Sequence, residues 1–62
     1  MIKSYFVRWK NLETGKSDCT PVDIEVRDYY KASHIINQIS KVLVQENLIH
    51  VSKIELLSIN LL

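Results

Sequence analysis

The chain starts with a segment, residues 2–10, in which apolar residues occupy every second position from Tyr5 to Trp9. This segment is rich in aromatic and β-branched residues, a composition that is typical of a β-strand. Tyr5, Val7 and Trp9 share one parity of the alternation and are all apolar. We therefore expect these side chains to face the core, which leaves Phe6 on the opposite face of the sheet.

The alternation is strictest in a second segment, residues 18–27. Here Val22, Ile24 and Val26 alternate with charged residues, which predicts a strand with one buried face and one wet face. Pro21 lacks the N–H group that a sheet ladder needs. This strand is therefore expected at an edge of the sheet.

The period of the pattern changes to that of a helix over residues 29–46. Asp28 precedes this segment as a candidate N-cap, since its carboxylate can accept from the free N–H groups of the first turn. Asn47 is a candidate C-terminal residue, because Asn tolerates the left-handed backbone. Aliphatic residues recur at spacings of three and four, which is the stripe of an amphipathic helix: Ala32, Ile35, Ile36, Ile39, Val42 and Leu43.

A last segment, residues 50–60, completes a strand–strand–helix–strand order within a single domain, residues 1–62. Gly15 lies in the polar stretch between the first two strands and predicts the turn of a hairpin. If the first strand lies between the other two, the helix makes a right-handed crossover between parallel strands. The predicted fold is α+β, with a mostly antiparallel three-stranded sheet in the order 2-1-3 and one helix on one face. The expected core is Tyr5, Val7, Trp9, Val22, Ile24, Val26, Ile35, Ile39, Leu43, Ile54 and Leu56.

The last strand carries aliphatic residues on both parities. Ile54 and Leu56 share the parity assigned to the core, whereas Leu57, Ile59 and Leu61 would point to the other face. An exposed apolar surface of this kind often marks an interface. We expect it to bind a partner on the open face of the sheet, and the predicted partner-binding residues are Phe6, Arg8, Leu57, Ile59 and Leu61.

This strand is also expected at an edge of the sheet, and it has no proline that would prevent pairing with a strand of another chain. Its charges, Lys53 and Glu55, fall in its first half, so the strand can add a strand from another chain. The alternative is that the last residues fold back over their own sheet or fray. On the open face we expect Arg8 to lie near Glu25 or Glu55.

Candidate chemistry is sparse. Cys19, His34 and His50 are the only sulfur or imidazole ligands, and none of them has a paired metal-binding spacing. The sequence TGKS, from Thr14 to Ser17, lacks the earlier glycine and the following helix that a phosphate-binding loop needs. We therefore expect no catalytic residue, no metal and no cofactor, in a protein that is not an enzyme.

The charge balance disfavours nucleic acid as a partner. Eight Lys and Arg residues against seven Asp and Glu residues give a net charge of +1, and no basic cluster stands out. Phe6 and Arg8 on an open sheet face are suited to stacking on bases. Asp23, Glu25 and Glu55 are expected on the same face, where they would repel phosphate. Binding of single-stranded nucleic acid stays as the alternative function.

The layout resembles the very short α+β proteins of phages and other mobile elements, which bind and inhibit host factors. Among these are anti-defence proteins such as antitoxins that cap a ribonuclease toxin and inhibitors of CRISPR effectors. The resemblance covers the whole chain in size and element order, and it assigns no site residue. It implies a non-enzymatic inhibitor that occludes a host protein in the host cytoplasm.

Further expectations concern location and self-association. No apolar run approaches the roughly eighteen residues that span a bilayer, and a single cysteine fits a reducing compartment. We therefore expect a cytoplasmic protein without a membrane partner. A core this small usually needs further stabilisation, such as a disulfide, a metal or an oligomeric partner. We therefore expect the partner to be a host protein, a second copy of this chain, or both. A structural subunit of a larger assembly is a further alternative.

Overall fold

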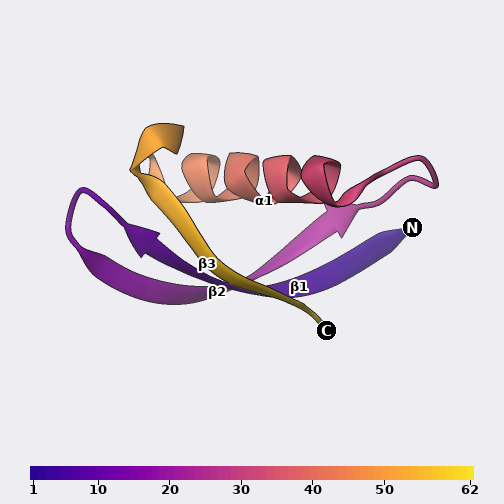
Figure 1. Ribbon diagram of the computed structural model, residues 1–62, viewed down its shortest axis with the longest axis horizontal. Helices are drawn as coiled ribbons and strands as arrows, with labels where there is room; N and C mark the ends of the chain where they lie inside the picture. The colour runs from indigo at the N-terminus through magenta and orange to yellow at the C-terminus, as the bar shows by residue number, and fades with distance from the viewer.

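The computed structural model describes residues 1–62 and forms two layers, a sheet and one helix (Figure 1). The sheet has the strand order β2-β1-β3, and β1 is antiparallel to both of its neighbours. The predicted α+β fold and strand order are therefore confirmed. The elements are β1 (Ile2–Asn11), β2 (Lys16–Glu25), α1 (Ala32–Asn47), the 3-10 turn η1 (Val51–Lys53) and β3 (Ile54–Leu61).

The hairpin between β1 and β2 turns at Gly15, as the sequence predicts. Gly15 has a φ of 75°, a left-handed conformation that costs a residue without a Cβ little. Its N–H donates to the Asn11 carbonyl at 2.7 Å, and the Asn11 side chain accepts from the Glu13 N–H at 2.9 Å. Both strands reach closer to the turn than predicted, and β2 ends two residues earlier than expected, at Glu25.

The helix begins later than the sequence indicates, so Asp28 is not its N-cap. Asp28 lies inside a tight turn in which the Tyr30 N–H donates to the Arg27 carbonyl at 2.9 Å. The helix starts at Ala32, and its N-cap is Lys31. The turn uses the residues before Ala32 and leaves Asp28 too far from the first helical N–H groups to cap them.

His34 replaces the expected carboxylate at the helix start. Its Nδ1 accepts a hydrogen bond from the Lys31 N–H at 3.0 Å, which satisfies a backbone donor at the helix end in the manner of a capping box. The imidazole also stacks on Tyr30, with ring centroids 5.3 Å apart. The segment that was predicted as the first helical turn is therefore held by an aromatic cluster.

The last helical residue is Asn47, and the left-handed residue is Leu48 after it, not Asn47 as expected. Leu48 adopts φ 54° and ψ 43°, whereas Asn47 stays helical and its side-chain amide donates to the Leu43 carbonyl at 2.9 Å. Leu48 is 90% exposed, so no packing offsets the steric cost of the left-handed backbone.

Leu48→Gly is accordingly expected to stabilise the protein by about 1 kcal/mol, because glycine removes that steric cost. For a domain of this size the melting temperature should rise by about 4–8 °C. Thermal unfolding followed by circular dichroism measures the change. Leu48→Ala is the control, and a gain as large as that of glycine would show that side-chain removal, not backbone conformation, is responsible.

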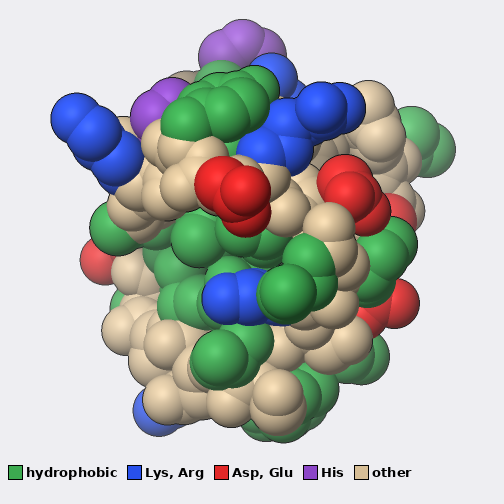
Figure 2. Space-filling model, turned by 90° about the vertical axis from the view of Figure 1, so that its right-hand side faces the viewer, with side chains coloured by type: hydrophobic (Ala, Val, Ile, Leu, Met, Phe, Trp, Pro, Cys, Tyr) green, Lys and Arg blue, Asp and Glu red, His purple; other side chains and the backbone are tan.

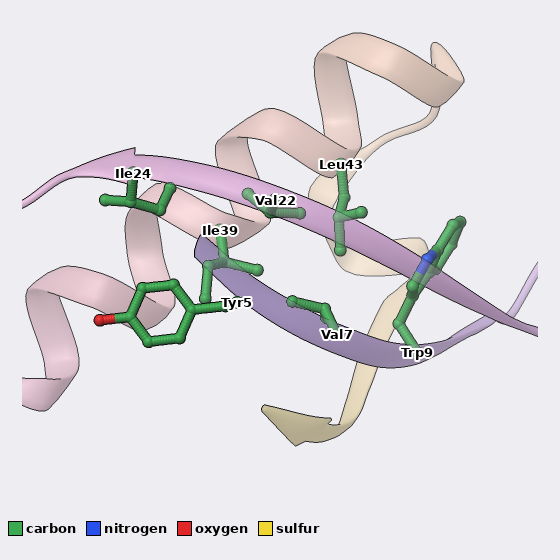
Figure 3. Close-up of a cluster of buried hydrophobic side chains, with 7 residues drawn as sticks. All are labelled: Tyr5, Val7, Trp9, Val22, Ile24, Ile39 and Leu43. Atoms are coloured by element: carbon green, nitrogen blue, oxygen red, sulfur yellow. The ribbon is translucent and has the colours of Figure 1, made fainter. Parts of the chain in front are cut away.

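The core lies between the helix and the β1–β2 half of the sheet (Figure 3). The predicted Val26, Ile35, Ile54 and Leu56 are partly buried and pack against it. The Trp9 indole N–H donates to the Thr20 hydroxyl at 3.0 Å, so this ring is buried without losing its hydrogen bond. The seven buried residues, all predicted from the sequence, are Tyr5, Val7, Trp9, Val22, Ile24, Ile39 and Leu43.

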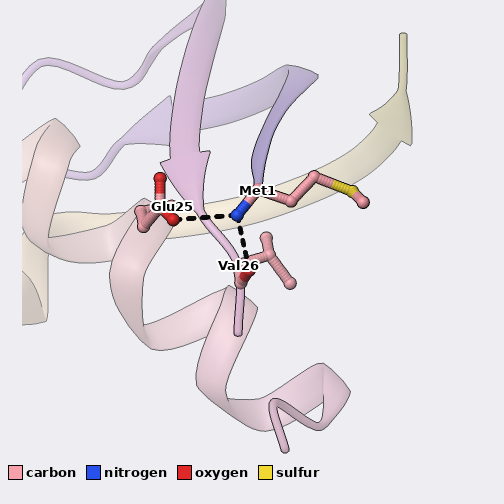
Figure 4. Close-up of polar contacts among 3 residues, drawn as sticks. All are labelled: Met1, Glu25 and Val26. Carbon is pink, nitrogen blue, oxygen red and sulfur yellow. Dashed lines mark hydrogen bonds and ion pairs between the residues drawn. The ribbon is translucent and has the colours of Figure 1, made fainter. Parts of the chain in front are cut away.

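The start of β1 is tied to the end of β2 (Figure 4). The ammonium group of Met1 contacts the Glu25 carboxylate at 2.8 Å, and the Val26 N–H donates to the Met1 carbonyl at 2.7 Å. The hydrogen bond from the ammonium, its charge and the charge of Arg27 hold the pKa of Glu25 below its ordinary value of 4.5, against a small opposing effect of desolvation.

This lowered pKa predicts a small pH dependence of stability. A carboxyl with a depressed pKa in the folded state stabilises the fold above its ordinary pKa, and the contribution is lost as the pH falls through the folded-state value. Glu25→Gln should therefore weaken the protein slightly near pH 7 and have no effect at a pH low enough to protonate Glu25 in the folded state. Urea unfolding at both pH values tests this, and an equal loss at both would refute the ion pair as its cause.

Candidate protein-binding surface

The strand β3 contains a β-bulge opposite the middle of β1. Arg8 lies opposite Ser58 and Trp9 lies opposite Leu56, so Leu57 has no partner on β1. In a regular strand successive side chains alternate between the two faces. One extra residue in a strand makes all later side chains of that strand point to the face opposite the one expected from their parity.

The bulge moves the end of β3 to the helix side of the sheet. Ile59 lies opposite Val7, and Leu61 lies opposite Tyr5. Directly opposite residues of an antiparallel pair project from the same face, and both partners are core residues. Ile59 is indeed packed against the core. The prediction that Ile59 and Leu61 share the open face with Phe6 is therefore wrong.

The double-sided aliphatic pattern of this strand follows from the bulge. Ile54 and Leu56 before it, and Ile59 and Leu61 after it, all project toward the helix side of the sheet. Leu57 itself stays 44% exposed at the bulge. The aliphatic residues on opposite parities thus belong to one face, and no continuous aliphatic patch covers the other.

The open face of the sheet is centred on Phe6 and Arg8. Phe6 is 41% exposed, and Arg8 is also exposed on the same side of the central strand. On β2, Pro21 lies opposite Phe6 and Cys19 lies opposite Arg8, and both are exposed. We call these four residues the open-face patch. Pro21 and Cys19 were not predicted, because the register of the hairpin was not fixed by the alternation.

The charges of this face are arranged differently from the expectation. Arg8 makes no ion pair, since its neighbours across the strands are Cys19 and Ser58. Glu25 lies at the far end of the hairpin, opposite Ile2, and Glu55 lies opposite Lys10. The guanidinium of Arg8 is therefore free to pair with a group from outside.

The polar end of the open face is ordered by contacts within the sheet. The Ser4 hydroxyl donates to the Asp23 carboxylate at 2.6 Å, and the two residues lie opposite each other in the register. Asp23 and Glu25 therefore lie beside one end of β1. Arg8 and Lys10 lie toward the other end, where Glu55 is opposite Lys10.

The remaining surface holds two shallow hollows. The first, about 440 Å³ in volume, lies between the helix and η1 and is lined by Asn37, Ser40, Lys41, Val44, Gln45 and Val51. The second, about 300 Å³, lies at the start of the chain and is lined by Met1, Lys3, Val26, Arg27, Asp28, Tyr30 and Ile35. On that end of the molecule hydrophobic side chains are interspersed with basic ones (Figure 2).

No group of three His, Cys, Asp or Glu side chains is placed to hold a metal ion. The thiol of Cys19 is free and exposed on the open face. None of the helices combines the length and the apolar content needed to cross a membrane. No known protein family, curated protein or solved structure matches this chain.

Proposed function

We propose that this chain is a small non-enzymatic protein-binding module that inhibits a partner protein by covering part of its surface. The class of protein it resembles in layout, the phage-type inhibitors and anti-defence proteins, works in this way. The observation that carries the proposal is the uncovered face of the sheet, where an exposed aromatic ring and an unpaired guanidinium lie side by side on the central strand.

The chemistry of the open-face patch suits a protein interface. Aromatic residues and arginine are enriched where binding energy concentrates. Phe6 and Arg8 project from β1, which is paired on both sides, so little backbone entropy is lost when a partner orders them. Asp23 and Arg8 lie on opposite sides of Phe6 along the face, and their opposite charges favour one orientation of the bound partner.

The proposal is tested by comparing what the intact and altered faces capture. Immobilised protein is incubated with a bacterial lysate, and bound proteins are quantified by mass spectrometry. We expect at least one protein to be retained by the wild type and reduced about 30-fold by Phe6→Thr combined with Arg8→Glu, which corresponds to a loss of about 2 kcal/mol. Circular dichroism confirms that the variant is folded.

A matched control changes the exposed side of the helix. Lys41→Glu reverses a charge, as Arg8→Glu does, but lies on α1 and away from the sheet. It should retain the same proteins as the wild type. Capture that survives the Phe6 and Arg8 changes, or that is lost with Lys41→Glu, would contradict the open face as the binding surface.

A second candidate function, binding of single-stranded nucleic acid, is favoured by the same pair of side chains. A ring and a guanidinium on adjacent exposed positions can stack on bases. Asp23 and Glu25, toward one end of the same face, work against it, because they repel phosphate. Fluorescence anisotropy with a labelled oligonucleotide at low salt tests whether the chain binds single-stranded nucleic acid. This function requires an affinity that falls steeply as salt is added.

A further inference from the structure

We propose that the free edge of β3 pairs with the β3 edge of a second copy of this chain. The two strands would run antiparallel about a two-fold axis and join two three-stranded sheets into one of six strands. This inference concerns the edge of the sheet and is independent of the open-face patch, which would remain uncovered on both copies.

The first support is the uneven distribution of the core. All seven buried residues come from β1, β2 and α1, and none comes from β3. The aliphatic residues of β3 that face the helix, Ile54, Leu56 and Ile59, are only partly buried, and Leu61 is 60% exposed. Apolar surface on the helix side of the sheet therefore stays in contact with water along this one edge.

The second support is the contrast between the two edges of the sheet. The edge strand β2 contains Pro21, and because proline cannot donate to β1, its nitrogen must face the outside. Asp18 and Asp23 on the same strand also oppose pairing with another chain. The edge strand β3 has eight residues, no proline and one charged residue, Glu55. Apart from its bulge at Leu57, β3 therefore lacks the features that prevent an edge strand from pairing with another chain.

The third support is the register that the bulge creates. Around an axis between Leu57 and Ser58, Leu56 would face Ile59 of the second copy. Ile54 would face Leu61 of the second copy in the same way. All four residues project to the helix side, so apolar side chains meet apolar side chains. In a strand without a bulge, the same axis would pair residues that point to opposite faces.

The same register keeps like charges apart. Glu55 would lie opposite Asn60 of the second copy, and the residues beside the axis, Leu57 and Ser58, are uncharged. A two-fold axis brings each residue near it close to its own copy, so a charge at the centre would be repelled. The β3 sequence places its one charge near an end.

The interface must also be large enough to hold two chains together. A stable pair of proteins buries about 800 Å² on each partner, which is less than a fifth of the 4461 Å² exposed by one chain.

Light scattering of the full chain across a dilution series tests the inference. We expect a mass of about 14 kDa, twice the 7.2 kDa of one chain. Leu57→Lys should give 7.2 kDa, because it places two like charges beside the axis, and Leu61→Lys should act in the same direction at the ends of the interface. Both residues are exposed, so both variants should remain folded by circular dichroism.

The control is Leu12→Lys, the same change at an exposed leucine in the hairpin turn, which should leave the dimer intact. A wild-type mass of 7.2 kDa at every concentration would overturn the inference. So would a dimer that persists in both Leu57→Lys and Leu61→Lys. None of these variants changes Phe6 or Arg8, so the outcome is separate from that of the capture experiment.

Discussion

Leu43→Ala is expected to lower the free energy of unfolding by about 2–5 kcal/mol, through lost apolar burial and the cavity left behind. Leu43 has no exposed surface and lies in a core of only seven buried residues. Small domains have a net stability near the lower end of the usual 5–15 kcal/mol. The variant should therefore be left with roughly 0–3 kcal/mol of stability at room temperature.

Urea unfolding followed by tryptophan fluorescence measures this loss, because the single Trp9 is 2% exposed in the folded state. The control is Leu12→Ala, which deletes the same atoms from a side chain that is 47% exposed. It should change the free energy of unfolding by less than about 0.5 kcal/mol. Equal losses for both variants would mean that Leu43 is not part of a packed core.

Ile59→Asp is expected to have the second large effect, a loss of about 2–3 kcal/mol in the free energy of unfolding. The bulge places Ile59 opposite Val7 and against the core. A carboxylate there would lose water without gaining a partner. Chemical denaturation at low protein concentration, where association does not contribute, gives the value for the single chain.

Leu57→Asp is the matched control for this change, two residues away in the same strand. Leu57 is 44% exposed and has no partner on β1, so its replacement should cost less than about 1 kcal/mol. If Leu57→Asp is the more damaging variant, the two residues have exchanged faces and the position of the bulge is wrong.

The sequence predicted the parts of the fold in which a periodic pattern is strong. The alternation of Val22 and Ile24 with charged residues, and the helical spacing of Ile39 and Leu43, each allow one buried face. With a single helix and short connections, few strand orders bring these buried faces together in one core. The core and the strand order therefore followed from the pattern.

The parts that could not be predicted depend on a local change in backbone geometry. Reading faces from parity assumes a regular strand, and one unpaired residue at Leu57 reverses the result for Ile59 and Leu61. Aliphatic residues on both parities were a signal of this bulge, but they fit an interface equally well. Asp28 has the chemistry of an N-cap, and only the turn closed by Tyr30 shows that the helix starts later.

The predicted site divides into two surfaces with different proposed roles. Phe6 and Arg8 lie on the open face, which we propose binds a protein partner. Leu57 and Leu61 are exposed along the β3 edge, which we propose pairs with a second copy. Ile59 packs against the core and therefore stabilises the folded chain. The substitutions at Phe6 and Arg8, at Leu57 and Leu61, and at Leu43 are made in different places, so binding, association and stability can be measured separately.

The most direct test of the account is an NMR measurement of proton contacts between β1 and β3 in isotopically labelled protein. Both surfaces depend on the reversal of side-chain faces at Leu57. The account predicts contacts of the Ile59 methyl groups with Val7 and with the helix, and none with the Phe6 ring. Contacts between Ile59 and Phe6, without contacts to Val7, would show a regular strand and contradict it.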